Sequence, residues 1–228
     1  MKSDLQAMYF KSKRNIVQFK TSIDSEAIGS DESTKTFLPE NEITLFVEKQ
    51  HKNSDSAKFE SNRLALLYNN GLAVPRLLSI KDNIIEMEYV NALTLPDLIN
   101  MWEETPDLKA QERAAGSLVG WLEKYYKIMS PETRGDINGR NFLFDGEKVW
   151  GVDFEEPSHA TIAEEVGLLL AYILTYSPEF TQIKKAFANQ IAFYASEAFD
   201  LTPDTLLQSQ ATALEMLNRR RKRNRLKT

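Results

Sequence analysis

Three polar side chains stand at spacings that suit phosphoryl transfer. Asn141 follows Asp136 by five positions, and Asp153 follows Asn141 by twelve. Oxygen ligands such as those of Asn141 and Asp153 suit Mg²⁺, which proteins hold with a few oxygens together with substrate phosphates and water. The second carboxylate, Asp136, can orient an acceptor hydroxyl and take its proton. The spacing therefore indicates magnesium-assisted transfer of a phosphoryl group to a hydroxyl.

The surrounding segments predict a β-hairpin that brings these residues together. Residues 141–144 and 148–154 are short apolar stretches, and Asp145-Gly146 between them is a strong turn signal. A hairpin places its two ends side by side, so we expect Asn141 and Asp153 to be neighbours. The remaining carboxylate lies just upstream, in a loop that contains two glycines.

This segment resembles the catalytic loop and metal loop of the protein-kinase-like superfamily, D-x-x-x-x-N followed by D-F-G. It is most similar to the aminoglycoside phosphotransferase and choline kinase branch, whose loop reads H-G-D-x-x-x-x-N. The chain departs from the pattern at two positions. Arg134 stands where that branch has His, and Glu155 stands where D-F-G has Gly. These departures leave open a pseudokinase, a non-catalytic binding module with the same fold.

A lysine at the end of an apolar strand face and a glutamate on the next helix fit the same resemblance. An unpaired ammonium is costly to bury, so Lys49 needs a partner or a path to water. The following helix, expected over 54–70, carries Glu60 in its first half. The resemblance implies that Lys49 binds the α- and β-phosphates of ATP and that Glu60 holds it. Glu42 and Glu48 remain rival partners.

Further nucleotide contacts are implied by the resemblance. The Ser- and acid-rich segment 22–35 is expected to be a loop. In the resemblance this loop covers the nucleotide phosphates, with Gly29 and Ser30 as the candidate contacts. A plain surface loop is the alternative, since no G-x-G-x-x-G pattern is present. Backbone groups of Glu88 and Val90 would bind the adenine edge at a hinge between two lobes.

A second stretch carries the same resemblance. Residues 59–80, FESNRLALLYNNGLAVPRLLSI, are similar to the aminoglycoside phosphotransferase pattern of an acidic helix followed by Gly-Leu-x-Val-Pro-x-Leu-Leu. Compact atypical kinases, of the RIO or tRNA-modification-associated type, are the second resemblance. The tRNA-modification-associated kinase is similarly compact and also ends in a basic tail.

Hydrophobic periodicity predicts a β-rich first part and a helical second part. Strands are expected at 15–19, 36–38, 43–49, 77–80 and 84–89, besides the hairpin. Helices are expected at 54–70, from Pro96, and at 107–129, 164–176, 180–199 and 205–217. The predicted fold is α+β and two-lobed, protein-kinase-like, with an N-lobe over 1–90 and a C-lobe over 91–228. Glu165 falls where relatives carry a carboxylate that braces the catalytic loop; a carboxylate favoured by the helix dipole is the alternative.

Composition limits the remaining possibilities for cofactors, location and partners. The 228 residues are 42% hydrophobic and 27% charged and contain no Cys, which excludes disulfides and thiolate metal sites. No apolar run could span a bilayer and no signal peptide is visible, so a cytoplasmic protein is expected. Residues 218–228 hold seven basic residues and no acidic one. This tail suggests contact with RNA or another polyanion, and a solvated helix end is the alternative.

The resemblance thus implies an ATP- and Mg²⁺-dependent phosphotransferase that acts on a hydroxyl, in the first interpretation that of a small molecule. The alternatives are a compact atypical protein Ser/Thr kinase and a pseudokinase.

Overall fold

The structure, a computed structural model, describes residues 15–20, 44–154 and 158–225. The chain divides into two compact units. Unit 1 takes in Met1–Ser61 and Leu77–Tyr89, and unit 2 takes in Asn62–Arg76 and Val90–Thr228. A functional division into lobes at residue 90 stays a prediction.

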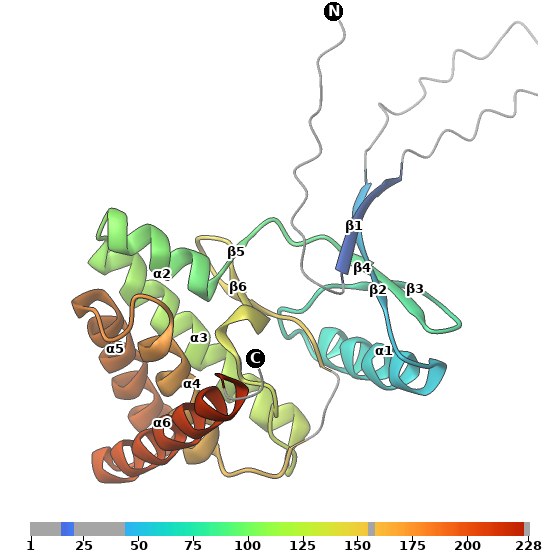
Figure 1. The fold of residues 1–228 in the computed structure, drawn as a ribbon. Coiled ribbons are helices and arrows are strands. Elements are labelled where there is room, and N and C mark those ends of the chain that lie inside the picture. The colour runs from blue at the N-terminus through green and yellow to red at the C-terminus, as the bar shows by residue number, and fades with distance from the viewer. Residues whose placement is uncertain (1–14, 21–43, 155–157, 226–228) are drawn as a thin grey trace, which may run out of the picture. The chain divides into compact units, whose positions relative to one another are not determined.

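An antiparallel sheet dominates the described part of unit 1. Its strands lie in the order β1-β2-β4-β3 (Figure 1). They are β1 Asn15–Lys20, β2 Thr44–Gln50, β3 Leu77–Lys81 and β4 Ile84–Glu88, and the helix α1 spans Ser54–Asn69. In β4 the alternate residues Ile85 and Met87 are buried while their neighbours are half-buried, as a period of two requires. The strands expected at 15–19 and 43–49, the hairpin of β3 and β4, and the helix over 54–70 are confirmed.

Unit 2 is mainly helical (Figure 1). Its small sheet has the order β5-β6-β7. The elements are β5 Leu93–Thr94, α2 Leu95–Glu104, α3 Leu108–Met129, the 3-10 helix η1 Gly139–Asn141, β6 Phe142–Phe144, β7 Val149–Gly151, α4 Ile162–Thr175, α5 Gln182–Phe199 and α6 Pro203–Arg225. Helix α4 packs on α6, and α3 packs on α5. The expected α+β class is confirmed. None of the described helices has both the length and the apolar content to cross a bilayer.

Side-chain caps explain where the helices of unit 2 begin. The oxygen of Asp107 accepts the N–H of Ala110 at 2.9 Å at the start of α3. Thr161 and Glu164 form a capping box at the start of α4, in which each side chain accepts the backbone N–H of the other. Each cap satisfies an N–H that the helix itself leaves without a partner.

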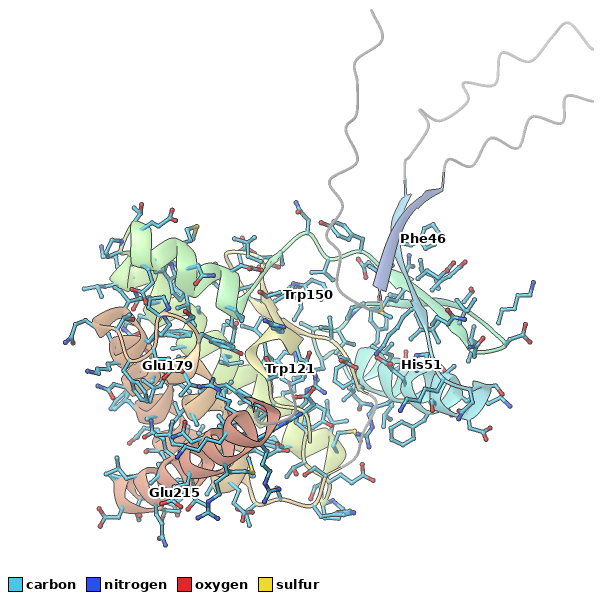
Figure 2. The ribbon with its side chains drawn as sticks, in the orientation of Figure 1. Phe46, His51, Trp121, Trp150, Glu179 and Glu215 are labelled. Atoms are coloured by element: carbon cyan, nitrogen blue, oxygen red, sulfur yellow. The ribbon has the colours of Figure 1, made fainter. Side chains whose placement is uncertain are left out.

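Trp121 of α3 lies in the aromatic core of unit 2 (Figure 2). Its ring stacks on Tyr125 at a centroid distance of 5.3 Å and meets Phe142 edge-on at 5.5 Å. The indole Nε1 donates to the carbonyl of Ala73 at 2.8 Å, so its polar atom is satisfied. Gly151 lies against the ring, because a Cβ there would be 2.1 Å from Trp121 Cζ2. Glycine is therefore what lets β7 approach α3.

Helix α6 is longer than the pattern predicts. The expected helix over 205–217 continues to Arg225 and takes in much of the basic tail. Leu217 is buried, and Arg221 Nη2 donates to the carbonyl of Thr175 at 2.9 Å. The start of the tail thus continues α6, with Arg221 docked on α4 and its neighbours Arg220 and Lys222 exposed, as the alternative of a solvated helix end expects. Its contact with RNA or another polyanion stays a prediction.

Replacing Gly151 by Ala should destabilise the protein, because the added methyl group overlaps the Trp121 ring. We expect the free energy of unfolding to fall by about 1–3 kcal/mol in chemical denaturation. The matched control is Gly120→Ala, at an exposed position of α3 where an added Cβ meets nothing within 4 Å. The control should gain about 0.5–1 kcal/mol, because Ala is the better helix former. Equal unfolding free energies for Gly151→Ala and wild type would contradict the packing argument.

Candidate functional site

One candidate group in unit 1 is a buried ion pair. Lys49 of β2 donates from Nζ to Glu60 Oε2 of α1 at 2.6 Å, and the two side chains are only 5% and 1% exposed. Removing either partner would leave the other charge buried and uncompensated. The expected contact between Lys49 and Glu60 is confirmed, while its rival Glu42 lies outside the described residues. Phosphate binding by Lys49 stays a prediction.

His51 lies beside this pair. Its Nε2 is 3.2 Å from the same Glu60 Oε2, without the alignment of a hydrogen bond. Asn83 fixes the backbone of His51: its carbonyl accepts the His51 N–H at 2.8 Å, and its Nδ2 donates to the His51 carbonyl at 2.7 Å. Two nitrogen-bearing side chains therefore surround one glutamate oxygen.

A separate candidate group in unit 2 is the loop around Asp136. Gly135 adopts φ +81°, a left-handed conformation that glycine reaches without strain. Glu165 of α4 accepts the N–H of Arg134 at 2.9 Å and that of Gly135 at 2.5 Å. Tyr126 donates its hydroxyl to the same carboxylate at 2.8 Å. Glu165 braces the loop, so the bracing role is confirmed over the helix-dipole alternative.

Asp136 is exposed, so an acceptor can reach its carboxylate. Its Oδ1 accepts the N–H of Asn138 at 3.2 Å. Asn141 donates from Nδ2 to the Asp136 carbonyl at 3.1 Å, which turns the amide so that its oxygen remains as an acceptor. The structure therefore joins Asp136 and Asn141 directly.

The predicted hairpin is confirmed and carries Asp153 to the same place. Strands β6 and β7 pair antiparallel, and beyond them Val152 N–H donates to the Asn141 carbonyl at 3.0 Å. The turn is fixed by Asp145, whose Oδ1 accepts the Lys148 N–H at 2.9 Å. Asp153 follows the strand with φ +66°. A left-handed Asp is uncommon, and such strained backbones concentrate at functional sites.

Arg134 links the loop to the Asp153 segment. It is 1% exposed, and its guanidinium donates to the carbonyls of Asp153, at 2.8 Å from Nη1, and of Val152 from Nη2. The guanidinium carbon lies 4.3 Å from the centroid of the Phe154 ring and 5.7 Å from that of Phe142, within range of cation–π attraction. Burial lowers the pKa of Arg134, although the nearby carboxylates oppose this shift, and an arginine remains charged at neutral pH.

The same buried environment affects Tyr126. Burial, and next the charge of Glu165, raise the pKa of the Tyr126 phenol well above its ordinary value. The phenol therefore stays protonated and serves Glu165 as a lasting hydrogen-bond donor.

Asn141 and Asp153 supply the oxygen donors that Mg²⁺ prefers. Among the described residues no three His, Cys, Asp or Glu side chains converge as a metal site. A cation held by these two residues would therefore depend on phosphate oxygens and water for its other ligands, which is the usual state of Mg²⁺ in phosphoryl transfer. The donor set fits the cation, and metal binding stays a prediction.

The structure says less about the other residues predicted for the nucleotide site and the metal loop. Gly29, Ser30 and Glu155 lie outside the described residues. Glu88 ends β4 in unit 1, and Val90 is the first residue of the second part of unit 2. Adenine contact at Glu88 and Val90 stays a prediction.

Two residues that hold the loop were missed or misjudged from the sequence. Arg134 was noted only as a departure from His, yet its position just before Gly-Asp was the available signal. Tyr176 gave no signal at all, because it lies far along the chain. Its hydroxyl donates to Asn138 Oδ1 at 2.9 Å and accepts the Gly139 N–H at 3.1 Å.

Comparison with known proteins gives one family. The chain matches the RIO domain over residues 40–164, more than half of its length. The match takes in Lys49, Glu60 and the whole region from Asp136 to Asp153. It supports the kinase-like superfamily and the second of the two resemblances, so the assignment to the aminoglycoside phosphotransferase branch is corrected. No curated protein matches the chain.

Replacing Arg134 by Met keeps an apolar stem but removes both donors to the Val152 and Asp153 carbonyls. We expect the free energy of unfolding to fall by about 2 kcal/mol or more, since each unsatisfied buried group costs about 1–3 kcal/mol. The control is Arg140→Met in the same loop, where the side chain is exposed and the change should stay within about 0.5 kcal/mol. Denaturant titration of both variants makes the comparison. Indistinguishable losses in the two would remove Arg134 from its linking role.

Proposed function

The chain belongs to the RIO domain family of kinase-like proteins, and we propose that it is an ATP- and Mg²⁺-dependent phosphotransferase that acts on a Ser or Thr hydroxyl of a protein. The observation that carries the proposal is the buried Lys49–Glu60 pair. A lysine held at a fixed place by a buried carboxylate is the recurring means by which kinases position ATP phosphates.

Each residue has a role in this proposal. Lys49, held by Glu60, contacts the α- and β-phosphates. Asn141 and Asp153 hold Mg²⁺, which supplies charge neutralisation on the phosphates when it is bound. Asp136 orients the acceptor hydroxyl and takes its proton. Catalysis then consists mainly of positioning and electrostatic stabilisation, because the transition state of phosphoryl transfer is loose.

The nucleotide contacts of the remaining predicted residues belong to the same proposal. Gly29 and Ser30 would cover the phosphates through backbone N–H groups, and the backbone of Glu88 and Val90 would bind adenine at a hinge near residue 90.

The family favours a protein acceptor over the small molecule of the first interpretation. A small hydroxyl compound remains the second acceptor class to assay. Arg134 does not argue for a pseudokinase, because it holds the Asp153 segment in place of the expected His.

Mg²⁺ and ATP together should raise the melting temperature, because a ligand that binds only the folded state stabilises it. At about a hundredfold excess over Kd the gain is about 2.7 kcal/mol, which corresponds to a shift of roughly 5 °C or more for a protein of this size. Differential scanning fluorimetry with ATP, with and without Mg²⁺, measures it. Lys49→Met should abolish the shift, and the exposed Lys127→Met should keep it. No shift at millimolar nucleotide would refute nucleotide binding.

Two conservative substitutions separate chemistry from binding. Asp136→Asn should lower turnover by about 10²–10⁴-fold, the scale of a positioned general base, while Mg²⁺-ATP still binds. Asp153→Asn should weaken Mg²⁺-dependent nucleotide binding as well as turnover, because it removes a charged metal ligand.

Phosphate transfer is followed with radiolabelled ATP on generic Ser/Thr protein substrates and on small hydroxyl compounds, with slow ATP hydrolysis as the fallback. Glu147→Gln, at an exposed position of the same hairpin turn, is the matched control for loss of a carboxylate outside the site. If wild type and Asp136→Asn turned over ATP equally, the catalytic assignment would fail and a binding module would take its place.

A further inference from the structure

The basic end of α6 is fixed to the end of α4. Arg221 Nη2 donates to the carbonyl of Thr175, the last residue of α4, at 2.9 Å. Its Nη1 donates to Glu179 Oε1 at 2.7 Å. A guanidinium at the carbonyl end of a helix is also favoured by the helix dipole. Arg221 thus sets where the neighbouring cations of α6 lie.

The next residue of the chain after Thr175 reaches the catalytic loop. Tyr176 donates its hydroxyl to Asn138 Oδ1 at 2.9 Å, and Asn138 N–H donates to Asp136 Oδ1 at 3.2 Å. A continuous series of contacts therefore runs from Arg221 through Thr175, Tyr176 and Asn138 to Asp136. All of these residues belong to unit 2.

Exposed cations stand at both ends of this series. Arg140 follows Asn138 in the loop, and Arg220, Lys222 and Arg223 flank Arg221; all four are exposed. Charged groups at both ends of the series act on the pKa of the Tyr172 phenol on α4. Burial raises this pKa, Asp136 raises it further, and Arg220 and Arg221 oppose the rise. Burial raises the pKa of the Tyr176 phenol, and the Gly139 N–H and then Arg140 oppose that rise. Arg140 thus belongs to the loop of Asp136, and Arg220 belongs to the helix end that this series of contacts connects to the loop.

We propose that Arg140 and Arg220 form an acceptor site for an acidic protein segment, so that the phosphorylated Ser or Thr is one flanked by Asp or Glu. The identity of the acceptor hydroxyl rests on the proposed function, whereas recognition of the acidic segment rests on the cations alone. One exposed arginine in the loop of Asp136 and a second on the helix end connected to that loop give a short acidic segment both attraction and alignment.

A nucleic acid fits this surface less well. It carries a charge about every 1.7 Å and binds along extended basic stripes. Here the chain as a whole carries a net charge of −5, and two arginines of the region, Arg219 and Arg221, are already paired with Glu215 and Glu179. A local cationic rim on an acidic protein suits a short acidic segment better than a long polyanion.

The test is a binding measurement that does not need catalysis. A fluorescent peptide with Ala at the acceptor position and Glu on both sides is titrated by anisotropy, next to the same peptide with Gln for each Glu. Wild type should bind the Glu peptide about tenfold more tightly than the Gln peptide, because two exposed charge pairs together change the affinity by about that factor. The double variant Arg140→Gln/Arg220→Gln should lose that preference. The control Arg219→Gln, which removes an exposed cation of the same helix, should keep it.

Three results would overturn the proposal: no preference in wild type, a preference that survives in the double variant, or tighter binding of a single-stranded RNA oligonucleotide that the double variant loses. Loss of the Mg²⁺-ATP melting shift in the double variant would also overturn it, because the arginines would then serve the nucleotide. If Mg²⁺ and ATP do not shift the melting temperature of wild type, the proposed function is refuted. The peptide titration then still tests whether Arg140 and Arg220 bind an acidic segment.

Discussion

A buried guanidinium holds the loop of Asp136 to the segment that carries Asp153. Arg134 begins the loop that carries Asp136, and it donates to the backbone carbonyls of the residues that carry Asp153. Its own N–H is held by Glu165, and its charge lies over the Phe154 ring. One side chain thus fixes two segments that the chain separates by a hairpin. Because the partners are main-chain carbonyls, the link constrains backbone position and leaves both carboxylates available for chemistry.

In each unit the candidate residues are organised by buried charge. In unit 1 the lysine is held by Glu60, with His51 beside the same oxygen. In unit 2 the loop is held by Glu165. Buried charged groups are costly unless they are fully partnered, so such contacts exist in few arrangements. The polar residues therefore specify geometry, while hydrophobic residues such as Trp121 and its aromatic neighbours form the core.

The sequence predicted the structural features that local patterns determine. It did not predict the contacts between residues that lie far apart in the chain. The hairpin followed from a turn signal, and the Lys49–Glu60 pair followed from motif order together with the cost of an unpaired lysine. The role of Arg134 depends on carbonyls that have no signature in the sequence, and Tyr176 meets Asn138 only because α4 folds back on the loop. The docking of Arg221 on α4 was not predicted, because charge alone does not show it. The family branch was wrong because D-x-x-x-x-N is shared across the superfamily.

The left-handed backbone of Asp153 has an evolutionary consequence. A residue other than glycine in this conformation costs about 1 kcal/mol or more. Substitution of this Asp by glycine would remove the backbone strain. A relative that no longer needs the carboxylate would therefore be stabilised by that single substitution. Retention of the carboxylate at this position is what selection for its charge would produce, and it gives a criterion for telling active relatives from inactive ones by a single residue.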